Sequence, residues 1–162
     1  MKVKDVMMRT PAFCNEASNA GEAVEMMWNR NCGLLPIVNA ENKVVGVVTD
    51  RDICIALGTR GIPAGELAIS EVTRGKVFSC ATEDEIHLAL ATMARNKVRR
   101  LVVLDKQERL EGILSMDDIV RHAAQQAPGR IADLSYADVV STLQHVFEMP
   151  VPQVVPANSA AA

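Results

Sequence analysis

The sequence predicts an α+β protein of two tandem β-α-β-β-α units that pack with pseudo-twofold symmetry, plus a C-terminal helix. Three observations predict this architecture. Apolar positions recur at a spacing of 66 residues, the spacing that separates Gly46 from Gly112. Each copy joins a helical pattern of apolar residues to two short β-rich runs. The repeat stops near residue 127, and one more helical pattern follows it.

The composition is that of a globular protein with few aromatic residues. The 162 residues are 49% hydrophobic and 23% charged, but only 3% are aromatic. A net charge of -3 and so few aromatic rings argue against binding to nucleic acid. No apolar run is long enough for a membrane span, and no secretion signal is visible, so we expect a cytoplasmic protein. The four cysteines lack metal or redox spacing and are expected to be buried thiols.

The first copy, residues 1–60, reads as a helix, a hairpin and a second helix. One face of the first helix is predicted to contain Ala20, Ala23, Val24, Met27 and Trp28. The apolar runs 34–38 and 44–48 flank a polar turn and predict a β-hairpin. A further helix begins after Thr49. Residues 61–66, with two glycines and a proline, are the predicted linker.

The second copy, residues 67–126, repeats this order. Its first helical face is predicted to contain Ile86, Ala89, Leu90, Met93 and Ala94. Thr82 and Glu85 have the spacing of a capping box at the start of that helix. The runs 101–104 and 110–114 predict the second hairpin. A unit of about 60 residues buries little core alone, so the two units should pack together.

The extension at residues 127–149 is predicted to contain one more helix, which is not part of the repeat. Ser135 and Asp138 are spaced as a helix cap. The apolar stripe that follows consists of Tyr136, Val139, Val140, Leu143, Val146 and Phe147. The helix either docks on its own module or crosses to a second subunit or partner. Residues 150–162, rich in proline, alanine and serine, are expected to be flexible.

The motif Gly-x-x-Thr/Ser-x-x-Asp occurs twice, at Gly46–Asp52 and Gly112–Asp118. Thr49 and Ser115 are good N-cap residues, and an acid three positions later completes a capping box. The same arrangement suits a nucleotide, because a helix N-terminus binds phosphate and a nearby carboxylate can accept hydrogen bonds from ribose. Glycine within a strand is costly unless something approaches it closely. Two occurrences at one offset favour the nucleotide interpretation.

The two copies resemble a tandem pair of CBS (cystathionine β-synthase) domains, a stand-alone Bateman module. The resemblance rests most on the string GVVTDRDI at Gly46–Ile53 and on its counterpart at Gly112–Ile119. Residues 5–7, 35–38 and 100–103 support it, and it covers about residues 1–124. It implies a regulatory, ligand-sensing module rather than an enzyme, with no cofactor requirement and no metal. The implied ligands are adenosine-containing: AMP, ADP, ATP, NAD or S-adenosylmethionine.

The resemblance also implies roles for individual residues. Thr49 and Ser115 would meet phosphate, and Asp52 and Asp118 would accept hydrogen bonds from ribose hydroxyls. The base pocket would be lined by Thr10, Pro11, Ala12, Phe13, Lys76, Val77 and Phe78, with Pro36, Val48 and Leu114 from the hairpins. The implied partners are an adenosyl nucleotide, a second copy in a homodimer and an unidentified regulated protein, with neither nucleic acid nor membrane. The alternative is a dimerising scaffold that binds no ligand.

The basic run at residues 95–100 has two interpretations. Cations at a helix C-terminus complement the helix dipole and stay solvated. Alternatively, Arg99 or Arg100 reaches a ligand phosphate, where the first copy has Gly33 and Leu34. On the second interpretation we expect the second unit's cleft to tolerate more phosphates than the first. The second copy also has Met116 in place of an acid and valine in place of a proline, which leaves open whether both clefts bind.

Overall fold

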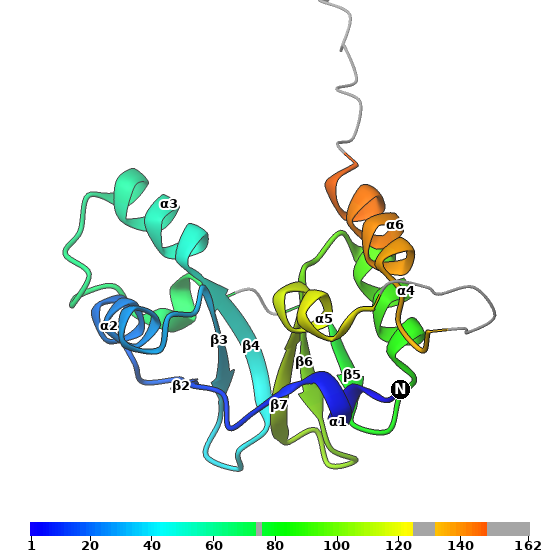
Figure 1. Cartoon of the computed structure of the whole chain (residues 1–162). Coiled ribbons are helices and arrows are strands. Elements are labelled where there is room, and N and C mark those ends of the chain that lie inside the picture. The colour runs from blue at the N-terminus through cyan, green and yellow to red at the C-terminus, as the bar shows by residue number, and fades with distance from the viewer. Residues whose placement is uncertain (74–75, 125–131, 149–162) are drawn as a thin grey trace, which may run out of the picture.

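A computed structural model describes residues 1–73, 76–124 and 132–148 of the chain, which form two α/β units side by side (Figure 1). The predicted α+β architecture with two tandem units and a C-terminal helix is confirmed. Within these residues, no helix is both long enough and apolar enough to cross a membrane. The predicted flexible tail at 150–162 and the start of the extension at 127–131 lie outside the described residues.

The first unit carries a sheet whose described strands are in the order β2-β3-β4. Its elements are β2 (Cys14–Asn15), α2 (Ala20–Arg30), β3 (Leu34–Val38), β4 (Val44–Thr49) and α3 (Asp50–Arg60). The hairpin strands β3 and β4 are antiparallel, with Leu34 opposite Thr49, while β2 runs parallel to β3. The hairpin therefore delivers Thr49 to the end of the sheet, next to the start of β3.

The second unit has described strands in the order β1-β7-β6-β5. Its elements are α1 (Val3–Val6), β1 (Met8–Arg9), β5 (Ser79–Ala81), α4 (Ile86–Asn96), β6 (Arg100–Leu104), β7 (Leu110–Ser115) and α5 (Met116–His122). Arg100 pairs with Ser115 as Leu34 pairs with Thr49 in the first unit. The second hairpin thus repeats the register of the first.

The opening segment of each copy packs in the unit formed by the other copy. Val3 and Val6 of α1 are buried in the second core, and the backbone N–H of Val3 donates to Asp84 O at 2.9 Å. In the opposite direction, Leu67 and Ile69 are fully buried in the first core; Ile69 begins the short 3-10 helix η1 (Ile69–Glu71). The two units are therefore joined by two crossing segments of chain.

Gly112 lies in β7, beside the crossing strand β1. The strands pair with Met8 opposite Ile113, and a Cβ at position 112 would lie 2.6 Å from Met8 O. A carbon and an oxygen normally stay more than about 3.3 Å apart. The close neighbour that requires glycine here is the chain's own backbone, so this glycine does not mark a ligand contact.

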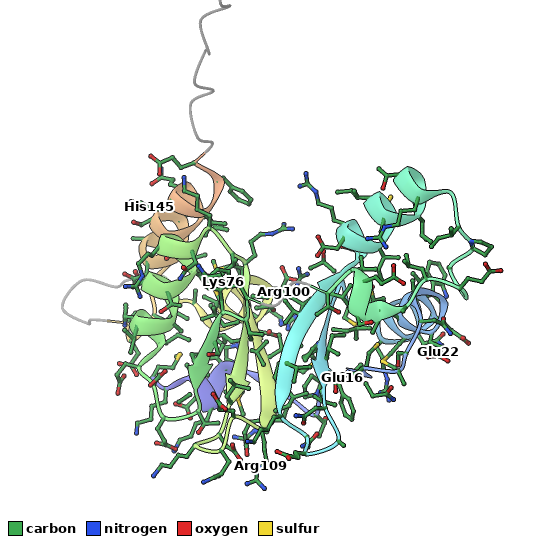
Figure 2. The ribbon with its side chains drawn as sticks, turned by 180° about the vertical axis from the view of Figure 1, so that it is seen from behind. Glu16, Glu22, Lys76, Arg100, Arg109 and His145 are labelled. Carbon is green, nitrogen blue, oxygen red and sulfur yellow. The ribbon has the colours of Figure 1, made fainter. Side chains whose placement is uncertain are left out.

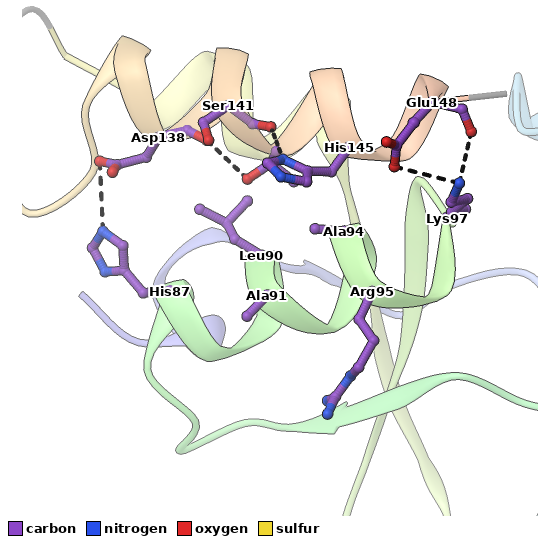
Figure 3. Close-up of a pocket in the computed structure, with 11 residues that line it drawn as sticks. His87, Leu90, Ala91, Ala94, Arg95, Lys97, Asp138, Ser141, His145 and Glu148 are labelled. Atoms are coloured by element: carbon purple, nitrogen blue, oxygen red, sulfur yellow. Dashed lines mark hydrogen bonds and ion pairs between the residues drawn. The ribbon is translucent and has the colours of Figure 1, made fainter. Parts of the chain in front are cut away.

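The C-terminal helix α6 (Tyr136–Phe147) packs on its own unit, against α4 and α5. Val139 and Val146 are buried in the second core together with Leu90 of α4. Figure 3 shows contacts between α4 and α6 at both ends of the helix pair. His87 lies beside Asp138 at one end, and Lys97 Nζ donates to the backbone oxygen of Glu148 at 2.8 Å at the other. Of the two placements left open by the sequence, the structure shows docking within the chain.

The first helical face of each copy meets a different environment. In α4, Ile86, Leu90 and Met93 are buried, whereas in α2 Val24 is 44% exposed and Trp28 is 85% exposed. The predicted apolar face is thus largely buried in α4, but in α2 it is exposed at Val24 and Trp28. The reason is that α6 covers α4, while no described helix of this chain covers the same face of α2.

Two local predictions were wrong. Helix α4 begins after Glu85, whose side chain makes no capping hydrogen bond, so Thr82 and Glu85 do not form a capping box. All four cysteines are free thiols, but Cys54 is exposed and only Cys14 is buried. Burial raises the pKa of the Cys14 thiol, and it raises that of the half-buried Cys80 to about 12.

Candidate functional site

Thr49 and Asp52 sit at the junction of β4 and α3. Asp52 Oδ2 accepts hydrogen bonds from Thr49 Oγ1 at 2.6 Å and from the Thr49 backbone N–H at 3.3 Å. In return, Thr49 Oγ1 accepts from the Asp52 backbone N–H at 3.2 Å. The motif therefore forms the capping box that its spacing predicts. Asp52 is 8% exposed, so its carboxylate is held in place at the start of an eleven-residue helix.

Ser115 and Asp118 repeat this capping box at the start of α5. Ser115 donates to Asp118 through both its hydroxyl and its backbone N–H. Arg121, one turn along α5, also forms an ion pair with Asp118 Oδ1. Position 121 corresponds in the repeat to Ile55 of the first copy.

A cavity of about 540 Å³ opens beside Thr49 and Asp52, between the two units. Thr49 and Asp52 line it from the first unit, while Lys76 and Phe78 line it from the opening segment of the second copy. The described residues that line it are Gly33, Leu34, Val47, Thr49, Asp50, Arg51, Asp52, Ile55, Lys76, Phe78, Val98, Arg99, Arg100 and Val102. A helix N-terminus, a hydroxyl and a carboxylate thus face one space together with apolar and aromatic side chains.

Four cations and two carboxylates are among the described residues of this lining: Arg51, Lys76, Arg99, Arg100, Asp50 and Asp52. Arg100 lies between the two units, and Lys76 lies on the side of the second unit (Figure 2). Lys76 Nζ is 4.9 Å from the centre of the Phe78 ring, which is cation–π distance. The chain as a whole is acidic, so this cavity is a local concentration of positive charge.

The structure places Arg99 and Arg100 in the cavity of Thr49, although the sequence assigned them to the cleft of the second copy. That assignment was wrong because the cavity is built across the units: the start of β6 faces the end of β4. Gly33, the counterpart of Arg99, sits against Asp50. A Cβ at position 33 would lie 2.8 Å from Asp50 Oδ2. A side chain at position 33 would therefore require the Asp50 carboxylate to move.

The remaining predicted site residues are spread over the molecule. Half-buried Val77 lies between two lining residues, while Pro36, Val48 and Leu114 are buried. In the other opening segment, Thr10 is exposed with a φ of 56°, Pro11 and Ala12 are half-buried, and Phe13 is 45% exposed. The described lining of the 540 Å³ cavity does not include these residues, nor Ser115 and Asp118.

Several lining residues were not singled out from the sequence. Leu34 could have been found from the hairpin, because it pairs with Thr49 at the end of the sheet. Ile55 lies one turn beyond Asp52 and shares its side of α3. Val98 and Val102 come from the other copy, and no local pattern indicates that they face Thr49. Among the described residues, no group of three or more His, Cys, Asp and Glu side chains could hold a metal ion.

Comparison with known proteins finds the family "CBS domain" twice in this chain, over residues 3–59 and 69–125. Inosine-5'-monophosphate dehydrogenase of Methanocaldococcus jannaschii is 33% identical over 136 residues, 80% of this chain. The match spans only 26% of that enzyme's length. The uncharacterized protein YlbB of Bacillus subtilis is 29% identical over 143 residues, which cover 85% of this chain and 93% of that protein.

Two solved structures extend this comparison. The CBS domain pair of protein MJ0100, in complex with 5'-methylthioadenosine and S-adenosyl-L-methionine, is 26% identical. It has a TM-score of 0.68 and covers 75% of this chain and 94% of that one. The CBS domain protein PAE2072 from Pyrobaculum aerophilum, complexed with AMP, shares the fold with a TM-score of 0.67 at 23% identity over 74% of this chain and 90% of that one. CBS pairs similar to this chain therefore bind adenosine-containing ligands, and with two matching copies the chain belongs to the CBS domain family.

Proposed function

We propose that this protein is a regulatory module that binds an adenosine-containing nucleotide in the cavity beside Thr49 and Asp52. The observation that carries the proposal is the joint lining of one 540 Å³ cavity by a capped helix N-terminus, a fixed carboxylate and residues of the opposite unit. The complex of the MJ0100 domain pair with two adenosyl compounds supports the choice of ligand class.

Each part of the ligand would meet a suitable group. Phosphate would lie at the N-terminus of α3, where backbone N–H groups favour an anion. The Thr49 hydroxyl, which donates to Asp52 Oδ2 in the structure, would turn to donate to the phosphate. The Asp52 carboxylate would accept hydrogen bonds from the ribose hydroxyls. The base would lie among the apolar lining, near Phe78 and Val102. Every described lining residue other than the six charged ones and Thr49 is glycine or apolar, which suits the flat face of a purine ring.

Regulation follows from the position of the cavity between the units. A ligand that contacts both units stabilises the arrangement in which they face each other as here, and differential affinity for that arrangement would shift the population. We propose that the protein acts in the cytoplasm, where nucleotides are present and free thiols persist.

Isothermal titration calorimetry with AMP, ADP, ATP, NAD and S-adenosylmethionine tests the proposal. Asp52→Ala should weaken binding of the best ligand by roughly tenfold or more, because hydrogen bonds to a charged group are lost. Asp138→Ala is the matched control: it removes the acid of an equivalent capping box, in α6, outside the described lining of the cavity. Absence of heat from every ligand would refute nucleotide sensing.

The alternative function, a dimerising scaffold, is favoured by a separate observation. A groove of about 710 Å³ runs between α2 and α3, and Val24, Met27, Trp28 and Leu57 are among its lining residues. Trp28 is 85% exposed there, on the face of α2 that matches the α6-covered face of α4. We propose that a second copy of this chain covers it. Sedimentation equilibrium should show a dimer that Trp28→Ser converts to a monomer; a monomeric parent protein would refute this.

A further inference from the structure

The cavity beside Thr49 contains one arginine whose surroundings differ from those of the other described arginines. Arg100 is half-buried, whereas the other arginines in the described ranges are exposed. Among described contacts, Arg60 pairs with Glu71 and Arg109 with Asp105. The Arg100 side chain makes neither a hydrogen bond nor an ion pair with any residue that the structure describes. A guanidinium that is partly removed from water and has no anionic partner favours an anion.

The direction of the Arg100 side chain is toward the first unit. It lines both the 540 Å³ cavity and the neighbouring groove between α2 and α3. Its charge also acts on the Cys32 thiol of the first unit, opposing the rise in pKa that burial causes there. The Arg100 guanidinium therefore lies on the same side of the cavity as the N-terminus of α3.

Two more cations extend this positive charge along the cavity. Lys76 enters from the opening segment of the second copy, and Arg99 precedes Arg100 at the start of β6. Their counterparts in the repeat are Thr10 and Gly33, neither of which is charged. Asp50 and Asp52 oppose part of this charge, but cations outnumber carboxylates in the described lining.

Resting on the proposed function, we infer that this cavity selects adenosine di- and triphosphates over the monophosphate and over S-adenosylmethionine. The α-phosphate would occupy the helix N-terminus, and Arg100 would bind the further phosphates with help from Lys76 and Arg99. S-adenosylmethionine carries a sulfonium, an ammonium and one carboxylate, so its net charge is positive, and the same cations disfavour it. The charge of the lining thus distinguishes this chain's ligand from the sulfonium compound bound by the MJ0100 domain pair.

Calorimetry with adenosine, AMP, ADP, ATP and S-adenosylmethionine, in magnesium-free buffer at two salt concentrations, tests the inference. ATP and ADP should bind at least about tenfold more tightly than AMP, the strength expected of charge-assisted hydrogen bonds. Arg100→Leu should reduce the ATP-to-AMP ratio toward one. Leucine is the repeat's own residue at this position, Leu34, so the variant should fold. Arg95→Leu, which removes an exposed cation outside the cavity lining, should leave the ratio unchanged.

The outcomes separate this inference from the proposed function. If adenosine or AMP binds but ATP binds no better, or if S-adenosylmethionine binds most tightly, the polyphosphate inference is overturned and nucleotide sensing stands. If no adenosine compound binds, the proposed function fails. Should Arg100→Leu not fold, the salt series decides: the ATP-to-AMP ratio must fall as salt rises, because the extra affinity is electrostatic. A salt-independent ratio contradicts the inference.

Discussion

Replacing Gly112 by alanine tests how the crossing strand β1 is held on the second unit. The new Cβ would lie 2.6 Å from Met8 O and 3.1 Å from the Met7 sulfur. An ordinary carbon–oxygen contact is about 3.3–3.6 Å, so the backbone of β1 must move by about 0.7–1.0 Å. Overpacking of this kind costs about 1–3 kcal/mol. Each β1–β7 backbone hydrogen bond lost as the strands separate adds about 1 kcal/mol.

Urea unfolding followed by circular dichroism measures the loss, and amide exchange at Met8 and Arg9 locates it. We expect Gly112→Ala to lower the free energy of unfolding by about 2 kcal/mol or more, from the two contributions together. The control is Gly58→Ala, in helix α3, where a Cβ would meet nothing within 4 Å. That variant should be more stable by about 0.5–1 kcal/mol. The reasoning is refuted if Gly112→Ala is as stable as the parent protein.

The remaining predictions concern stability, pH and thiol reactivity. Met93→Ala should cost about 2–5 kcal/mol in urea unfolding, because Met93 is fully buried in the second core. Ser135→Ala removes the N-cap of α6 and should cost about 0.5–2 kcal/mol, with faster amide exchange confined to that helix's first turn. Hydrogen bonds from two lysines, Lys2 first, lower the pKa of Glu83 to about 2. The stabilisation that results from this shift is complete above the ordinary pKa of 4.5 and is lost as the pH falls toward 2. The thermal midpoint of Glu83→Gln should therefore depend less on pH over that acid range than the midpoint of the parent protein. Exposed Cys54 should react with a thiol reagent before buried Cys14; equal rates would contradict the structure.

The elements that the sequence predicted well are those set by local pattern. The runs 34–38 and 44–48 became β3 and β4, and the cap at Ser135 begins α6 as expected. Residue spacing determines whether a segment is a helix or a strand, and a hydroxyl before an acid at the right spacing forms a cap wherever it occurs. Because the two copies share one pattern, each element predicted in one copy was also predicted in the other.

The features that the sequence did not predict depend on what lies opposite a residue. Trp28 and Ala94 occupy the same helical position, yet only α4 is covered by α6, so spacing cannot distinguish them. Gly112 indicated a close approach, but only the fold shows that Met8 is the neighbour. Arg100 adjoins the second copy in sequence and faces the first copy's Thr49 in space. Because the cavity is lined by residues of both copies, the position of a residue in the sequence does not show which cavity its side chain lines.

The crossing of the opening segments affects how the chain can fold during synthesis. The first core can close soon after Ile69 leaves the ribosome, since its last buried contributor is then available. Val3 and Val6 lack their other buried partners until the second core, which runs from Ile86 to Val146, has been made, 80 residues or more after them. Contacts that distant in sequence close slowly. A chain divided in the linker at 61–66 would give two halves that each carry a segment of the other's core, so neither should fold alone, and mixing them should restore both.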